Sequence, residues 1–355
     1  MRKIMTTLRT PAQFCDHGMV PPGRRAALDA VTARYAVALP QAVAELINLN
    51  DPRDPIARQF VPDVAELDRQ PQELADPIGD DAHSPVEGIV HRYPDRVLLK
   101  LTPVCAIYCR FCFRREMVGP ANGKTLSAAA LERALDYIRG RPEIWEVILT
   151  GGDPLVLSAR RLRAVMRELA GIAHVKVLRI HTRVPVAAPS RITADLVRAL
   201  KVKGKPTYVA LHVNHAGELA PAARAACARM ADAGIPLLGQ SVLLKGVNDT
   251  PAALADLLRA CVECRIKPYY LHHADLAPGT AHFRTDVATG QELMRALRGR
   301  LSGLCQPSYV LDIPGGHGKS PIGPSYLAET GSNGSAHYVV EDFNGVRHRY
   351  PPATA

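Results

Sequence analysis

The strongest constraint on the fold is a repeating pattern that begins near residue 96, in which short apolar runs alternate with longer amphipathic segments. The runs predict strands at residues 96–102, 146–149, 175–180, 208–213, 237–244 and 268–272. The segments between them predict helices at residues 126–139, 159–169, 194–200, 219–233 and 252–264. Six strand-then-helix units favour an α/β fold with a parallel sheet, but they fall short of the eight units of a closed barrel.

The regions on either side of this pattern differ from it. Residues 1–90 contain helical patches at 24–38 and 41–47 between loop-like stretches rich in Pro and Asp, which predicts an N-terminal helical extension. Residues 91–302 make up the predicted partial barrel. Residues 303–355 contain a strand-like stretch at 308–311, a glycine-rich turn, and a predicted hairpin of residues 337–340 and 346–350 around Asn344-Gly345.

The overall charge is basic, with 44 Lys and Arg against 34 Asp and Glu and a net charge of +10. Such a balance is typical of proteins that contact nucleic acids, but the arginines are spread over many predicted helices, so we expect no nucleic-acid partner. The eight cysteines do not form the pattern of a disulfide framework, and the chain has no apolar leader and no run of 18 apolar residues. We therefore expect a cytoplasmic protein without a membrane span.

Three cysteines stand close together directly after the first predicted strand of the repeating pattern. Cys105, Cys109 and Cys112 recur at gaps of four and three residues, and no other thiol is nearby in the sequence. Thiolates suit iron–sulfur clusters, and three of them leave one iron of a [4Fe–4S] cluster open to an outside ligand. A structural zinc site normally has four protein ligands. The alternative is that these cysteines are simply buried small side chains.

The Cys-x3-Cys-x2-Cys spacing, with an aromatic residue at Phe111, resembles the signature loop of the radical S-adenosylmethionine (SAM) enzymes. The resemblance implies a [4Fe–4S] cluster whose open iron binds SAM, and reductive cleavage of SAM to a 5′-deoxyadenosyl radical. It also implies an open, partial (β/α)6 barrel. In such a barrel the ligand site lies at the carboxyl ends of the strands, which is where the cysteine loop is placed.

Residues at the ends of other predicted strands are candidates for contacts with SAM. Gly151, Gly152 and Asp153 end the second strand, where paired glycines let a ligand approach the backbone and a carboxylate can accept from an ammonium. By resemblance, this segment holds the amino group of the methionine part of SAM. The other candidates are His212, Asn214 and Gln240. The alternative for all of them is a structural role in turns and strand caps.

A glycine-rich turn in the C-terminal region has the sequence Asp-Ile-Pro-Gly-Gly-His-Gly-Lys-Ser from Asp312 to Ser320. Its ending suggests a phosphate-binding loop, but a Walker A motif requires glycine where Ile313 stands. The amine of Lys319 on such a turn is accessible. That suits covalent attachment of an aldehyde such as pyridoxal 5′-phosphate (PLP).

Many segments in one order resemble the lysine 2,3-aminomutases, which are radical SAM isomerases that use PLP. The matching segments lie at residues 92–96, 112–115, 151–154, 240–249 and 275–285 and in the turn that ends at Lys319. The resemblance implies that Lys319 is the catalytic lysine that carries PLP. It also implies that Arg92 and Arg96 anchor PLP.

The same resemblance assigns three residues to the substrate. Arg114 corresponds to the residue that binds the substrate carboxylate, and Asp275 and Asp312 correspond to the pair that binds the distant ammonium of lysine. Relatives that take glutamate have lysine and asparagine at those two positions, so two acids indicate lysine. The alternative for each charged residue is a surface salt bridge.

We therefore expect an isomerase that moves the α-amino group of L-lysine to the β-carbon, with a reducing electron donor such as flavodoxin or ferredoxin. The fullest relatives bind zinc between subunits through cysteines in a C-terminal tail, but no cysteine follows Cys305 here, which leaves zinc and the homo-oligomeric state open. The alternatives within the enzymes are an aminomutase that supplies β-lysine for elongation factor P, or one for another amino acid. Outside the enzymes, the alternative is a basic iron–sulfur protein that transfers electrons or binds RNA.

Overall fold

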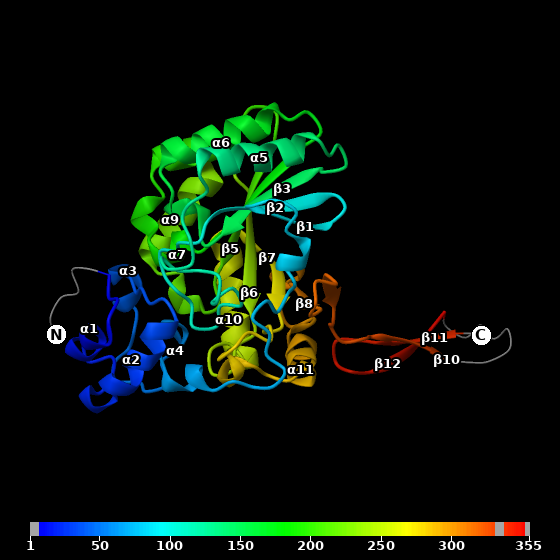
Figure 1. Cartoon of the computed structure of the whole chain (residues 1–355). Helices are drawn as coiled ribbons and strands as arrows, with labels where there is room; N and C mark the ends of the chain where they lie inside the picture. The colour runs from blue at the N-terminus through cyan, green and yellow to red at the C-terminus, as the bar shows by residue number, and fades with distance from the viewer. Residues whose placement is uncertain (1–6, 331–336, 352–355) are drawn as a thin grey trace.

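The computed structural model describes residues 7–330 and 337–351. Its main body is a curled sheet of nine strands whose spatial order follows the sequence (Figure 1). The strands are β1 Ile89–Tyr93, β2 Arg96–Thr102, β3 Glu146–Gly151, β4 Val177–Thr182, β5 Thr207–His212, β6 Leu237–Val242, β7 Ile266–His272, β8 Ser308–Asp312 and β9 Lys319–Pro321. Strands β2 to β8 are parallel, whereas β1 and β9 pair antiparallel at the two edges. No pairing joins β9 to β1 within the described residues, so the predicted open, partial barrel is confirmed.

Helices cover the outer face of this sheet (Figure 1). They are α5 Ala128–Arg139, α6 Ala159–Gly171, α7 Val184–Ala187, α8 Ala194–Leu200, α9 Pro221–Asp232, α10 Pro251–Glu263 and α11 Val287–Leu297. Helix α6 shows why these segments are helical. Ser158 caps its first turn by accepting from the amide of Arg161, and Leu162, Val165 and Leu169 recur at helical spacing and are buried against the sheet.

Three elements are clearly shorter than their sequence patterns predict, and one of them is the helix predicted at 41–47, which ends at Ala44. The strand predicted at 237–244 ends at Val242, because Asn248 closes a turn by accepting from the amide of Leu244 and donating to the carbonyl of Val242. The helix predicted at 24–38 ends at Arg34, because the backbone is extended from the next residue on.

The N-terminal residues form short helices, α1 Pro11–Asp16, α2 Arg25–Arg34, α3 Gln41–Ala44 and α4 Pro55–Phe60. They share an apolar cluster of their own, which includes Phe14, Val31 and Phe60. Ile107 of the cysteine loop belongs to the same cluster. The N-terminal helices therefore pack against one side of the cysteine loop.

The C-terminal residues form a second, antiparallel sheet that projects from the body (Figure 1). Its strands are β10 Leu327–Thr330, β11 His337–Glu341 and β12 Arg347–Tyr350. Arg298, which follows α11, donates to the carbonyls of Glu341 and Asp342 and so fastens the projecting sheet to the body.

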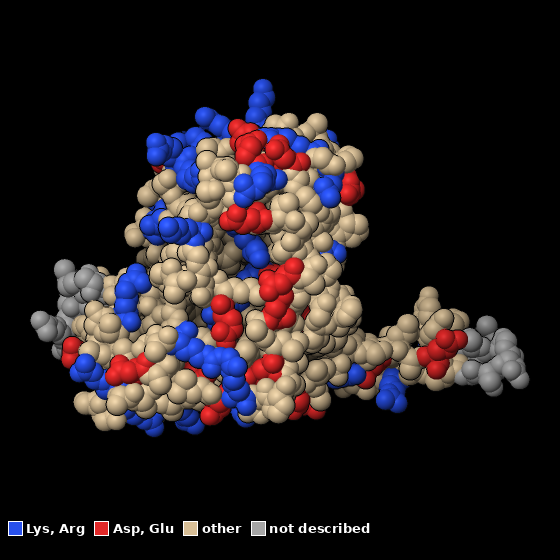
Figure 2. All heavy atoms as spheres, viewed as in Figure 1, with Lys and Arg blue, Asp and Glu red and all other residues tan. Residues whose placement is uncertain are grey.

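Charged side chains of both signs are interleaved on the face shown in Figure 2. Ion pairs also join neighbouring helices: Arg139 on α5 pairs with Glu132 and Asp136 of the same helix and with Glu168 on α6. Its positive charge is thus partly neutralised by these neighbours. In the described part of the chain, none of the helices has the length and apolar character needed to cross a membrane.

Candidate active site

A cavity of about 820 Å³ occupies the inside of the partial barrel. Most of the residues predicted from sequence to bind cofactors or substrate line it. They are Arg92, Arg96, Cys105, Cys109, Cys112, Arg114, Gly151, Gly152, Asp153, His212, Gln240, Asp275, Asp312 and Lys319. These residues come from β1, the start of β2, the cysteine loop, the ends of β3, β5 and β6, the segment after β7, the end of β8 and the start of β9.

The three cysteines of the loop are unpaired and face this cavity together. Burial raises the pKa of each thiol, to about 12 for Cys109. Within the described residues, no three His, Cys, Asp or Glu side chains form a cage for a single metal ion. A cubane cluster places each thiolate on a different iron, which needs a wider arrangement, and bound iron deprotonates its thiols. Three unpaired thiols that line one cavity supply the donor set that such a cluster requires.

The paired glycines hold the end of β3 against the start of the cysteine loop. Gly151 has a φ of +116°, and a Cβ there would lie 2.6 Å from the carbonyl oxygen of Thr102. A Cβ at Gly152 would lie 2.4 Å from the carbonyl oxygen of Val104. Glycine is required at both positions because the two backbone segments lie too close together to leave room for a side chain. This backbone contact fixes the loop on the sheet.

The carboxylate of Asp153 is engaged within the protein. Its oxygens accept from the hydroxyl of Thr182 at 2.7 Å, the amide of Arg183 at 2.7 Å and the amide of Leu155 at 3.0 Å. Burial raises its pKa, while these hydrogen bonds oppose the increase. Asp153 thus ties the ends of β3 and β4 together beside the cysteine loop.

The remaining strand-end candidates occupy different environments. His212 and Gln240 line the cavity, and burial lowers the pKa of His212 to about 3, so its ring is neutral. Asn214 does not line the cavity and is 1% exposed. It donates to Gln59 of α4 and accepts from the amide of Val242, which joins the N-terminal helices to the barrel.

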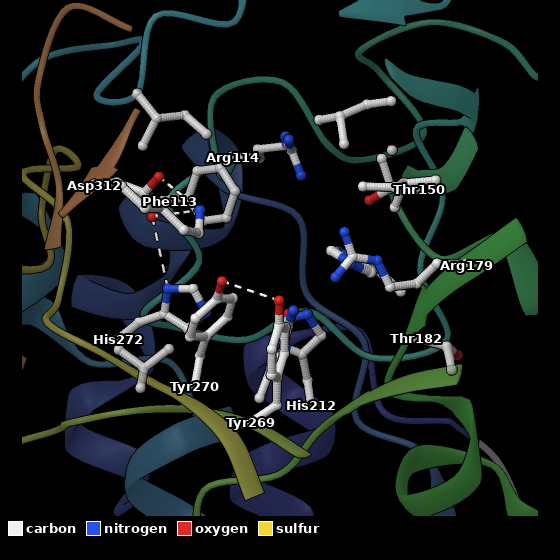
Figure 3. A pocket seen from close by; sticks show the side chains of 18 of the residues that line it. Phe113, Arg114, Thr150, Arg179, Thr182, His212, Tyr269, Tyr270, His272 and Asp312 are labelled. Carbon is white, nitrogen blue, oxygen red and sulfur yellow. Dashed lines mark hydrogen bonds and ion pairs between the residues drawn. The ribbon is translucent and has the colours of Figure 1, made fainter. Parts of the chain in front are cut away.

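Lys319 and Asp312 form an ion pair at one end of the cavity. The Nζ of Lys319 lies 2.6 Å and 2.8 Å from the two carboxylate oxygens of Asp312. His272 on β7 approaches the same carboxylate at 3.6 Å (Figure 3). The two residues meet because β8 and β9 pair antiparallel, with Asp312 opposite Lys319.

Asp275 lies near this pair, and its electrostatic environment differs from that of Asp312. Burial, reinforced by the negative charge of Asp312, raises the pKa of Asp275 to about 7. Burial alone would also raise the pKa of Asp312, but the neighbouring ring of His272 and the charge of Lys319 hold it below its usual range. At neutral pH one carboxylate is therefore fully ionised and the other is close to its midpoint.

The predicted arginines are held by carboxylates. Arg92 and Arg114 both pair with Asp80, at 3.0 Å and 2.9 Å. Arg96 pairs with Asp95 at 2.7 Å and stacks over the ring of Tyr93. Of the three arginines, Arg96 is the most exposed, with 33% of its side chain accessible.

Several residues that line the cavity are not among those predicted from the sequence. Tyr269 and Tyr270 stack with ring centroids 3.9 Å apart, and their hydroxyls are 3.0 Å apart (Figure 3). Arg179 on β4 pairs with Glu146 on β3 at 3.0 Å. A signal for such residues was present in β4, where Arg179 and His181 alternate with apolar residues, because side chains two apart on a strand share one face.

The chain is similar to known proteins over most of its length. Residues 99–258 match the family model of the radical SAM superfamily, and residues 294–354 match the family model of lysine-2,3-aminomutase. L-lysine 2,3-aminomutase of Clostridium subterminale is 42% identical over 305 residues, which cover 86% of this chain and 72% of that protein. A putative L-lysine 2,3-aminomutase of Aquifex aeolicus is 36% identical over 343 residues, covering 97% and 92%. Glutamate 2,3-aminomutase of Clostridioides difficile is 37% identical over 303 residues, covering 85% and 71%.

These similarities extend over the barrel and over the C-terminal segment that carries Lys319. Radical SAM enzymes use a [4Fe–4S] cluster and SAM, and lysine 2,3-aminomutases use PLP as well. The chain belongs to the lysine 2,3-aminomutase family of the radical SAM superfamily, a family of isomerases.

Proposed function

We propose that this chain converts L-lysine to β-lysine by moving the α-amino group to the β-carbon, with PLP attached to Lys319. The observation that supports this most strongly is the charge arrangement of the cavity, which places Arg114 together with Asp275 and Asp312. A diamino acid has a carboxylate that requires a cation and a distant ammonium that requires an anion. The cavity offers both kinds of partner.

Each residue has a defined part in this proposal. Arg114 binds the carboxylate of lysine, and Asp275 and Asp312 bind its ε-ammonium. Asp312 already binds a primary ammonium in the structure, that of Lys319. Covalent attachment of Lys319 to PLP would draw that ammonium away and leave the carboxylate for the ε-ammonium of the substrate.

The remaining candidates serve the cofactors. Cys105, Cys109 and Cys112 would hold the [4Fe–4S] cluster, and the end of β3 with His212 and Gln240 would border SAM. Arg92 and Arg96 would anchor PLP. When bound, the cluster and SAM supply a radical that takes a hydrogen atom from lysine, and PLP stabilises the resulting radical. The electron comes from a donor such as flavodoxin or ferredoxin.

Glutamate is the second candidate substrate, because one relative is a glutamate 2,3-aminomutase. Its side-chain carboxylate would face Asp312, whose pKa is held low and which is therefore negatively charged. Like charges at close range repel strongly inside a protein. The cavity therefore favours lysine. Supply of β-lysine for elongation factor P would use the same chemistry and is an alternative physiological role.

Anaerobic incubation of the reconstituted protein with SAM, a reductant and either lysine or glutamate tests the proposal. We expect β-lysine from lysine and no β-glutamate from glutamate, measured by chromatography with mass spectrometry. Formation of β-glutamate without β-lysine would contradict the assignment of the substrate.

Borohydride reduction followed by peptide mapping tests the cofactor independently of turnover. We expect PLP to be trapped on the peptide that contains Lys319. Lys319→Ala should lose this adduct and keep its iron. Trapping on another lysine in the unaltered protein would contradict the assignment of Lys319.

A further inference from the structure

Asp80 is a buried carboxylate that links two arginines of the active site. It lies at the start of the 3₁₀ turn Asp81–His83 in the N-terminal part of the chain, and it is 0% exposed. Its Oδ1 accepts from Nη2 of Arg92 at 3.0 Å, and its Oδ2 accepts from Nε of Arg114 at 2.9 Å. Each oxygen therefore holds one guanidinium, and Asp80 itself does not line the cavity.

The bond to Nε determines which edge of Arg114 faces a ligand. With Nε engaged by Asp80, the two terminal nitrogens remain as donors, and no hydrogen bond within the described chain uses them. The guanidinium also stacks on the ring of Phe113 at 4.5 Å, which restricts its rotation. Two terminal nitrogens side by side can bind a carboxylate through two parallel hydrogen bonds.

The position of Asp80 is itself fixed. Its amide donates to Asp76 at 2.9 Å, and the preceding Gly79 packs directly on the glycine turn that leads to Lys319. Burial alone would raise its pKa, but Arg114, Lys100 and Arg92 outweigh this and keep the pKa below its usual range. Asp80 is therefore ionised at neutral pH and can accept from both arginines at once.

We propose that Asp80 is a positioning residue that gives the active site its preference for a substrate with a carboxylate. Asp80 binds Nε of Arg114, so that the two terminal nitrogens of Arg114 are presented to the cavity. It also binds Arg92 and holds that guanidinium away from the terminal nitrogens of Arg114. This inference rests on the proposed role of Arg114 in binding the carboxylate of lysine. An asparagine at position 80 would offer one acceptor oxygen to two arginines, and its amide group would face the other guanidinium donor to donor.

Equilibrium binding of lysine and of cadaverine, which is lysine without its carboxylate, tests this inference. Both ligands are titrated calorimetrically into the anaerobic holoenzyme without SAM, so that no turnover occurs. In Asp80→Asn the ratio of lysine affinity to cadaverine affinity should fall at least tenfold, with cadaverine affinity within about threefold of the parent. A ratio within threefold of the parent would overturn the proposal. So would an equal loss of both affinities, which is the result expected from a merely structural role.

Two further variants sharpen the test. Asp81→Asn makes the same change of charge at the next, exposed residue and should leave both affinities unchanged. Asp80→Glu keeps two acceptor oxygens and should retain most of the preference for lysine over cadaverine. If Asp80→Glu loses this preference as fully as Asp80→Asn does, the sharing of one carboxylate by two arginines is not the cause of the preference. Asp80→Glu also carries the test if Asp80→Asn does not fold.

The two proposals fail in different ways. If the parent protein binds cadaverine as well as lysine and forms no β-lysine, the proposed function is wrong and the role of Asp80 falls with it. If the parent prefers lysine and forms β-lysine while Asp80→Asn keeps that preference, only the role of Asp80 is wrong.

Discussion

At the scale of single residues, Asp312 has the contacts of a binding group rather than of a turn cap. Its carboxylate is bound by the side chains of Lys319 and His272, and the backbone amides of the following turn do not donate to it in the described structure. Only 6% of its side chain is exposed. Its charge is thus directed at an ammonium in the cavity.

Asp312→Asn should lower the turnover of lysine at least tenfold and leave the iron content unchanged. Removing one partner of a buried ion pair typically costs about 3–5 kcal/mol, and 1.4 kcal/mol corresponds to a factor of ten. β-Lysine formation and iron analysis measure the two quantities. Asp256→Asn, at an exposed position on α10, is the control. Turnover within about threefold of the parent would show that Asp312 does not bind the ammonium.

Asp275 should make the stability of the fold depend on pH. A carboxyl group with a pKa of about 7 in the folded state and about 3.9 in the unfolded state holds an extra proton when folded. Its stabilising contribution is therefore complete below the unfolded pKa and is lost as the pH rises through about 7.

Asp275→Asn removes this dependence. The unfolding free energy of the variant relative to the parent should rise by on the order of 2–3 kcal/mol between pH 5 and pH 8. Urea unfolding of both proteins at the two pH values measures the change. An unchanged difference between variant and parent would mean that the carboxyl group of Asp275 is not perturbed.

At the scale of elements, the loop that carries the cysteines is held by the N-terminal part of the chain. Glu66, in the turn Val64–Leu67, is 0% exposed and binds the guanidinium groups of both Arg110 and Arg115. Both arginines belong to the loop that connects β2 to α5. The amide of Arg110 also donates to the carbonyl of Gln59 at 2.9 Å. A loop without regular structure thus gains a fixed shape from a distant segment.

Glu66→Gln should lower the unfolding free energy by about 3–5 kcal/mol, because it leaves two buried guanidinium groups without their counter-ion. It should also lower the iron retained after desalting, since the loop that presents the thiols loosens. Urea unfolding and iron analysis test the two effects. Glu87→Gln breaks an exposed pair with Arg133 and should cost less than about 1 kcal/mol. If the two variants lost equal stability, Glu66 would not be the anchor of the loop.

At the scale of the whole molecule, segments from the two ends of the chain meet at the active site. Gly79 has a φ of +68°, and a Cβ there would lie 2.5 Å from the backbone nitrogen of Gly316. The segment of Asp80 therefore packs directly on the turn of Lys319. This contact couples the N-terminal part of the chain to the segment that carries the proposed PLP lysine.

Gly79→Ala should destabilise the fold by more than about 1–2 kcal/mol, which is the cost of left-handed backbone for a residue other than glycine before any clash is added. It should also reduce the PLP retained on Lys319. Gly323→Ala is the matched control, because a Cβ there meets nothing within 4 Å and its φ is not positive. Equal melting temperatures for the two variants would contradict a close contact at Gly79.

Local pattern determined much of this protein from sequence alone. The alternation of strand and helix periods predicted the open parallel barrel, because each period reflects which face of one element is buried. The spacing of Cys105, Cys109 and Cys112 predicted the cluster loop, since ligands for one compact group can lie within a single short segment. The rule that ligands bind at the carboxyl ends of parallel strands then predicted the candidate site at that edge of the sheet.

The tertiary structure alone decided the pairings between distant residues. Asp80 is 34 positions from Arg114, and Glu66 is 44 positions from Arg110, so no local period links them. The tertiary structure also directs the side chain of Asn214 to Gln59 and away from the cavity. The sequence does not distinguish it from His212, because His212 ends β5 and Asn214 lies only two residues further on. Periodicity reports which side of an element is buried. Contacts between charged side chains inside the barrel depend on how the N-terminal segment and the C-terminal turn pack against it. That packing is determined by the whole chain.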